Sequence, residues 1–355
     1  MMDKKINTLV GIFLVTVGLT TREVRAEPVV YIGGSGTGIS STLMKVIRET
    51  NTWKKHGLDV RNVFFTSGAL LGRAMLSGDI TATNGDIPGM LSMGVSGVLD
   101  LKVIAVTMNR LDTYFVARKL IAKPDDLKNK RIAVSRFGSL SDISTRLLMR
   151  FWKLDPEKDV IILQTGNSPS RVAALVAGQV DAGLMSLTVI DKLVASGCCR
   201  VLADLTELPL DYAQFGVAVP TALLKSQRDT LRLLLQALLE GIYITKTRPD
   251  VVLKALREEG IDDLRVGKTV HERMVKNVPD YPMPELKGVQ SAIDSLALPK
   301  ARGAQAKDFM DTSLLEEIKK KRLYRSSLWQ GFMRSRTSSN LFFSGGSPKA
   351  RATLR

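Results

Sequence analysis

Apolar residues in the first two thirds of the chain follow two alternating patterns. Short β-branched runs such as Val60–Phe65 are followed by segments such as Ala69–Leu76, in which apolar residues recur at helical spacing. The same alternation starts again at Arg131–Val134 and continues to Val219. Two successive series of strands and helices predict an α/β protein with two lobes and mostly parallel sheets.

From Pro220 onward the pattern is helical. The predicted helices are Leu223–Arg248, Pro249–Glu259, Gly267–Lys276, Pro284–Leu296 and Thr312–Lys320. Because no strand pattern separates them, we expect this helical C-terminal segment to pack on the lobes.

The first predicted strand ends in a loop of glycine and hydroxyl residues, Gly33–Gly38. Glycines let the backbone approach a ligand closely, and the helix that follows presents free N–H groups that favour an anionic or polar group. Ile39 stands where a phosphate-binding P-loop would have Lys and where a dinucleotide loop would have Gly. We therefore interpret the loop as a binding site for a small molecule, and a tight turn without a ligand is the alternative.

Similar polar turns follow the other predicted strands. The candidate ligand-binding residues in these turns are Ser35, Gly36, Thr37, Ser67, Gly68, Asn84, Asp86, Arg136, Ser139, Asn167, Ser168 and Ser186. In open α/β sheets, ligands bind beyond the carboxyl ends of the strands, where helix N-termini point. We therefore expect these turns to meet around one ligand.

Several of these candidates have a simpler interpretation. Asp86, Ser139 and Ser168 suit helix N-caps whether or not they bind a ligand, and the charge of Asp86 would repel an anion. Arg110 and Arg136 follow predicted strands, and either guanidinium is able to hold a carboxylate or sulfonate through two parallel hydrogen bonds. The alternative for each arginine is a solvated surface charge.

The two ends of the chain differ from the rest. Residues 1–26 combine a basic start, a short apolar run and a small residue before the expected cleavage point, as a secretory signal peptide does. A retained membrane anchor is the alternative. Residues 321–355 contain eight Lys or Arg and no Asp or Glu, which is typical of a disordered basic tail. We interpret the tail as a solvated extension, with a nucleic-acid or membrane-surface role as the alternative.

Charge, cysteine and histidine content indicate which kinds of ligand and site to expect. The chain carries a formal charge of +16, of which the signal supplies +2 and the tail +8, leaving +6 on residues 27–320. A basic core suits a protein that handles anions. Cys198 and Cys199 are adjacent, so we expect a buried pair of thiols, and a strained bond between them is the alternative. His56 and His271 are too far apart in sequence to indicate a metal site. We expect neither a metal nor a cofactor.

Four segments, in this order, carry a family resemblance. They are Trp53–Val60, Met75–Ile80, Pro124–Val134 and Ala173–Ala182. With them the chain resembles the substrate-binding proteins of ABC importers of the nitrate, sulfonate and taurine type. Asn129 departs from the Gly common in that turn, and the basic tail lies outside the pattern.

The resemblance implies a two-lobed periplasmic-binding-protein fold of the Venus flytrap type. Lobe one would comprise residues 27–117 and 220–320, and lobe two residues 118–219. The chain would cross between them near Tyr114–Arg118 and Ala213–Val219.

The resemblance also implies a function. The protein would be a periplasmic monomer that closes on a small organic anion and delivers it to an ABC permease in the inner membrane, without nucleic acid. A related branch with the same fold contains thiamine-pyrimidine synthases, which makes an enzyme one alternative. The lone Cys198-Cys199 pair matches the Cys-rich, iron-binding form of that branch poorly. A ligand-binding module that serves a sensor or another partner protein is the second alternative.

Overall fold

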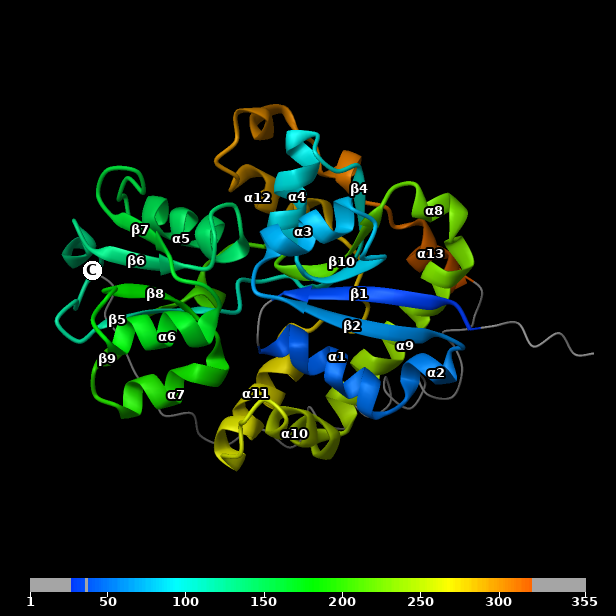
Figure 1. Cartoon of the computed structure of the whole chain (residues 1–355), viewed down its shortest axis with the longest axis horizontal. Coiled ribbons are helices and arrows are strands. Elements are labelled where there is room, and N and C mark those ends of the chain that lie inside the picture. Colours follow the sequence, from blue (N-terminus) through cyan, green and yellow to red (C-terminus); the bar gives the residue numbers. More distant parts are fainter. Residues whose placement is uncertain (1–26, 36–37, 321–355) are drawn as a thin grey trace, which may run out of the picture.

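The computed structural model describes residues 27–35 and 38–320 of the chain. These residues form two lobes that lie side by side, each built on a sheet with helices on its faces (Figure 1). The expected signal peptide, the expected basic tail and the candidate residues Gly36 and Thr37 lie outside the described residues.

The first lobe contains a sheet of five strands. They are β1 (Val29–Ser35), β2 (Asp59–Phe65), β3 (Ala82–Asp86), β4 (Leu101–Met108) and β10 (Phe215–Pro220), in the order β2-β1-β3-β10-β4. β1 runs parallel to β2 and β3, whereas β10 runs antiparallel to β3 and β4.

The second lobe repeats this arrangement. Its strands are β5 (Tyr114–Arg118), β6 (Arg131–Val134), β7 (Ile161–Gln164), β8 (Ala182–Met185) and β9 (Cys199–Asp204), in the order β7-β6-β8-β5-β9. β6 is parallel to β7 and β8, and β5 is antiparallel to β8 and β9. The predicted two-lobed α/β fold is confirmed. Each sheet is mixed, because the strand that returns from the other lobe enters antiparallel to its neighbours.

Helices cover both sheets. In the first lobe they are α1 (Ile39–Glu49), α2 (Thr52–Lys55), α3 (Gly68–Leu76) and α4 (Ile87–Ser96), and in the second they are α5 (Leu140–Phe151), α6 (Ser168–Val176) and α7 (Leu187–Ala195). The C-terminal segment adds α8 (Leu223–Ser226), α9 (Arg228–Thr247), α10 (Pro249–Arg257), α11 (Leu264–Asn277), α12 (Leu286–Asp294) and α13 (Ser313–Lys320). Short 3₁₀ turns are η1 (Pro124–Leu127), η2 (Leu205–Glu207), η3 (Pro299–Gly303) and η4 (Ala306–Phe309).

The C-terminal helices pack on the first lobe, although the single helix predicted from Leu223 to Arg248 is wrong. Gln227 leaves the helical region with φ −128° and ψ 30°, so α8 ends there and α9 begins. The packing follows from the amphipathic pattern. In α1, Leu43, Val46 and Ile47 are fully buried, and Gly241 of α9 lies so close to Ile47 that a Cβ there would approach it to 2.1 Å.

Two segments connect the lobes, residues 109–113 after β4 and residues 205–214 after β9. The crossings were expected near Tyr114–Arg118 and Ala213–Val219. In the structure β5 and β10 occupy most of these segments, and the two connections directly precede the two strands. Gln214 is fully buried, and its side-chain oxygen accepts the backbone N–H of Asp112 at 2.6 Å, which joins the two connections. The lobe limits expected from the sequence stay a prediction.

Candidate functional site

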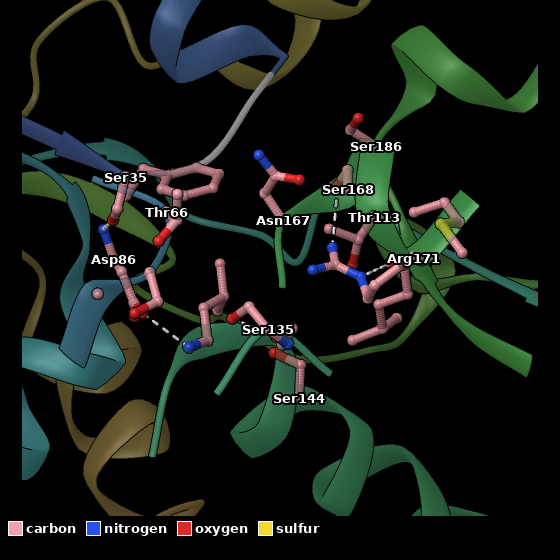
Figure 2. Close-up of a pocket in the computed structure, with 17 residues that line it drawn as sticks. Ser35, Thr66, Asp86, Thr113, Ser135, Ser144, Asn167, Ser168, Arg171 and Ser186 are labelled. Atoms are coloured by element: carbon pink, nitrogen blue, oxygen red, sulfur yellow. Dashed lines mark hydrogen bonds between the residues drawn. The ribbon is translucent and has the colours of Figure 1, made fainter. Parts of the chain in front are cut away.

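A cavity of about 80 Å³ lies between the two lobes (Figure 2). Most of its lining side chains carry a hydroxyl group: Ser35, Thr66 and Ser67 from the first lobe, Thr113 from a connecting segment, and Ser135, Ser141, Ser144, Ser168 and Ser186 from the second lobe. Pockets for drug-sized ligands begin at roughly 300 Å³. This cavity therefore suits a molecule of only a few non-hydrogen atoms.

The lining residues gather at the carboxyl ends of parallel strands. Ser35 and Asp86 are the last residues of β1 and β3, and Ser135 and Ser186 directly follow β6 and β8. Residues at the starts of five helices, α3, α4, α5, α6 and α7, line the cavity, so the N-termini of these helices lie at its wall. The dipoles of these helices place partial positive charge at such ends, which favours an anion.

Arg171 is the only basic side chain among the lining residues that the structure describes. It lies in α6 and is 6% exposed. Its guanidinium donates to the backbone oxygens of Leu184 at 3.0 Å and Gly166 at 2.8 Å, and to the hydroxyl of Ser168 at 2.9 Å. None of these three hydrogen-bond partners is a carboxylate. Burial lowers the pKa of Arg171 to about 10. A buried cation held only by neutral groups is ready to pair with an anion.

Asp86 lies on the opposite wall and joins the two lobes. One carboxylate oxygen accepts the N–H of Gly89 at 2.7 Å and caps α4, as predicted. The other accepts the N–H of Leu140 at 2.7 Å, at the start of α5 in the second lobe (Figure 2). Burial raises the pKa of Asp86 to about 6. Since both oxygens are engaged, Asp86 serves here as a cap for one helix from each lobe.

Gly68 is required beside this carboxylate. A Cβ at position 68 would lie 2.1 Å from Oδ2 of Asp86, closer than any side chain tolerates. Gly68 therefore lets α3 begin against the Asp86 side chain.

The hydroxyl groups of the cavity differ in whether they have hydrogen-bond partners within the protein. Ser135 and Ser141 lie 2.9 Å apart through their side-chain oxygens, and Ser141 also accepts the Ser135 N–H. The buried hydroxyl of Thr113, in the first connecting segment, has no hydrogen-bond partner among the described residues. An unpaired buried hydroxyl costs free energy, and a ligand group in the cavity would satisfy it.

The structure places the predicted site residues in three groups. Those that line the cavity are Ser35, Ser67, Gly68, Asp86, Asn167, Ser168 and Ser186. Asn84 and Ser139 are buried but bond elsewhere, Asn84 to Ser40 and Ser139 to Ser135. Arg110 and Arg136 are exposed and do not line the cavity.

Two local expectations are corrected. Asn84–Asp86 is not a turn, since these residues form the end of β3 and are buried between β1 and β10. In α6 the N-cap is Asn167, whose side chain accepts the Ser170 N–H, and Ser168 is the first helical residue. The Ser168 hydroxyl is thereby free of the cap and accepts from Arg171 instead.

Arg171 lines the cavity but was not among the site residues predicted from the sequence. A signal was present, because Arg171 lies three and four residues before Ala174 and Leu175, which form the buried face of α6. An arginine on an apolar helical face is buried only if neutral groups or an anion can solvate it. The helix pattern therefore pointed to this residue more strongly than to the two exposed arginines.

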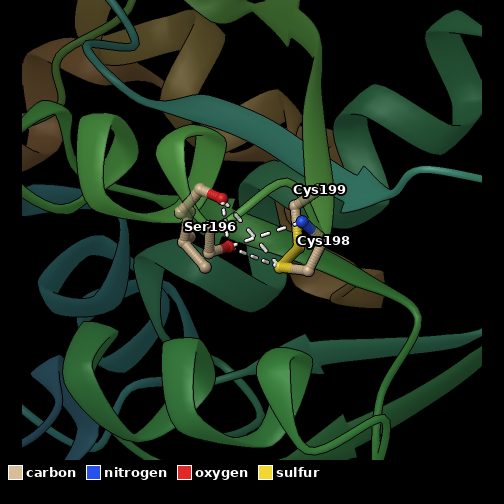
Figure 3. Close-up of a disulfide and its surroundings, with 4 residues drawn as sticks. Ser196, Cys198 and Cys199 are labelled. Atoms are coloured by element: carbon tan, nitrogen blue, oxygen red, sulfur yellow. Dashed lines mark hydrogen bonds between the residues drawn. A yellow bond between two sulfur atoms is a disulfide. The ribbon is translucent and has the colours of Figure 1, made fainter.

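The structure also corrects the expectation for the cysteines. Cys198 and Cys199 form a disulfide at the start of β9, and the described part of the chain contains no free cysteine (Figure 3). Ser196 donates its hydroxyl to the sulfur of Cys198 at 3.1 Å. The structure thus contains the bond that the sequence analysis gave as the alternative to two thiols.

Comparison with known proteins places this chain in a family. The family model described as NMT1/THI5 like matches residues 44–251. The chain belongs to this family. Among curated proteins, the NMT1/THI5-like chain is 30% identical over 163 residues to the taurine-binding periplasmic protein of Escherichia coli, a match that spans 45% of this chain and 49% of that protein. The chain thus spans about half the length of the curated relatives it matches.

Solved structures support the fold. The alkanesulfonate-binding protein SsuA of Xanthomonas axonopodis, solved with MOPS, superposes with a TM-score of 0.63 at 20% identity and covers 76% of this chain and 92% of its own. The nitrate-binding protein NrtA of Synechocystis gives a TM-score of 0.66 at 12% identity, covering 84% and 90%. At these identities the likeness concerns the two-lobed fold.

Among the described residues, none of the helices has the length and apolar character needed to cross a membrane. Within the same residues, no group of three or more His, Cys, Asp or Glu side chains is placed to hold a metal ion.

Proposed function

We propose that this protein is the periplasmic solute-binding component of an ABC importer. It holds a small organic anion, of the sulfonate, nitrate or carboxylate type, between its lobes. Hinge closure then presents the loaded form to a permease in the inner membrane. Such closure requires only that the ligand binds the closed arrangement more tightly than the open one.

The buried guanidinium of Arg171 carries this proposal. It is 6% exposed, it faces the cavity, and its protein partners are neutral. An anion would restore the electrostatic stabilisation that the guanidinium loses on leaving water. The small cavity and its hydroxyl lining favour a compact oxyanion, which accepts several hydrogen bonds at once.

The comparisons support the rest of the proposal. Relatives and structural neighbours carry the names of taurine-, sulfonate- and nitrate-binding proteins, and the chain shares their family and fold. We propose binding without chemical conversion, export to the periplasm as a monomer, and no role for nucleic acid. Asp86 supports the non-catalytic proposal, because both of its carboxylate oxygens are occupied by backbone N–H groups.

Thermal unfolding of the purified protein tests the proposal. The panel is taurine, methanesulfonate, nitrate and acetate, with dimethyl sulfone as the uncharged counterpart of methanesulfonate. A ligand at a hundred times its dissociation constant adds about 2.7 kcal/mol of stability, which shifts the midpoint by several degrees. We expect at least one anion to do so and dimethyl sulfone not to. Equal shifts from methanesulfonate and dimethyl sulfone, or none from any anion, would contradict an anion site of this type.

A further inference from the structure

A second charged cluster lies at the connection between the lobes. Arg273 projects from α11, which packs against α9 and α10 of the first lobe and also against α7 of the second. Its side chain is 14% exposed and ion-pairs with two carboxylates, Asp112 and Asp204. Because it does not line the cavity, its role is separate from the anion site.

The two carboxylates belong to different sides of the hinge. Asp112 is tied to the first sheet, because its N–H bonds to Gln214, whose own N–H donates to Met108 at the end of β4. Asp204 is the last residue of β9 in the second sheet. One guanidinium therefore bridges a group fixed to the first lobe and a group fixed to the second.

Arg273 and Asp204 of the second lobe form a bidentate ion pair. Two nitrogens of Arg273 donate to the two oxygens of Asp204 at 2.9 and 3.1 Å, and one also reaches the Thr206 hydroxyl at 3.3 Å. The guanidinium also lies over the ring of Tyr114, the first residue of β5, with its carbon 4.6 Å from the ring centre. Because α11 packs mainly on helices of the first lobe and β9 belongs to the second sheet, both paired hydrogen bonds join the two lobes.

Electrostatics strengthen the bridge. Burial by itself would raise the pKa of Asp204, but the hydrogen bonds from Arg273 hold it below its ordinary value. Asp112 lies close enough for its charge to repel that of Asp204. Without Arg273, two partly buried carboxylates would face each other across the hinge.

We propose that Arg273 is a positioning residue that holds the two lobes closed by bridging Asp112 and Asp204, and thereby strengthens binding of the cleft anion without touching it. This inference rests on the proposed function, because a bridge across the hinge affects affinity only if the lobes open to admit a ligand. The affinity measured for a ligand falls with the fraction of molecules in the binding-competent form.

Small-angle X-ray scattering of the full-length protein, with and without methanesulfonate, tests this role. The variants are Arg273→Gln and Asp204→Asn. Asparagine at 204 can still cap the Thr206 N–H, so this variant preserves the local turn. The matched control is Arg265→Gln, which removes an arginine from the same helix that is 91% exposed and pairs with Asp263.

We expect both variants to have a larger radius of gyration than the wild type in at least one of the two conditions, with the control unchanged. Where methanesulfonate binds, its dissociation constant should rise about tenfold in both variants. Folded variants whose scattering superposes on the wild type in both conditions would overturn the proposal. If Arg273→Gln does not fold, Asp204→Asn decides. A failure of methanesulfonate to bind counts against the anion site alone, since the ligand-free comparison still tests the bridge.

Discussion

Replacement of Arg171 by methionine separates ligand binding from folding. The lowered pKa, about 10 against an ordinary value of 12.5, means that burying the charge costs about 3 kcal/mol. Methionine removes this cost but also removes three hydrogen bonds of a charged donor, worth about 4.5–9 kcal/mol together at roughly 1.5–3 kcal/mol each. The two effects oppose each other, so the free energy of unfolding without ligand should fall by about 2–6 kcal/mol.

The same change should greatly weaken anion binding. Loss of one partner of a buried charge pair typically costs about 2–5 kcal/mol, which is a decrease in affinity of about 30-fold to a few thousand-fold. Urea unfolding gives the stability, and isothermal titration with the best anion of the panel gives the affinity. Arg150→Met is the control, because Arg150 lies in α5 of the same lobe, is exposed and does not line the cavity. Binding by Arg171→Met within threefold of the wild type would refute an anion site at this guanidinium.

Three further predictions follow from the cavity. Gly68→Ala should lower the free energy of unfolding, measured by urea titration, by about 1–3 kcal/mol, because the new methyl group displaces the Asp86 carboxylate. Gly303→Ala is the control: no atom lies within 4 Å of a Cβ at position 303, so this change should have little effect. The pKa of Asp86 is about 6 in the folded protein against 3.8 ordinarily, so the folded state binds more protons in this window. The contribution of Asp86 to the free energy of unfolding should therefore rise by up to about 3 kcal/mol as the pH falls from 7 to 4. If the difference in free energy of unfolding between the wild type and Asp86→Asn does not change with pH, this prediction is wrong. Arg110→Met and Arg136→Met should leave anion affinity within about twofold, because both side chains are exposed and outside the cavity; a tenfold loss in calorimetry would place the anion elsewhere.

Much of the fold was predictable because it depends on local pattern. The β-branched run Val60–Phe65 lies within β2, and the run Arg131–Val134 has the same bounds as β6. Asn129, which stands where the resembling proteins commonly have Gly, adopts the left-handed conformation that favours Gly, with φ 60°. The location of the ligand site was predictable as well, because polar residues at the carboxyl ends of parallel strands meet at one edge of the sheet.

The sequence by itself thus determined the two α/β lobes, their strands and the edge at which a ligand would lie. Only the tertiary structure decided which charges act there. Arg110, Arg136 and Arg171 have the same side chain, and they differ in what surrounds it: α6 directs Arg171 onto the backbone of β8, while the other two face solvent. Likewise, Asp86 and Arg273 join the lobes through partners 54 and 69 residues away. Burial and long-range pairing arise only when distant segments pack together, so no local pattern records them.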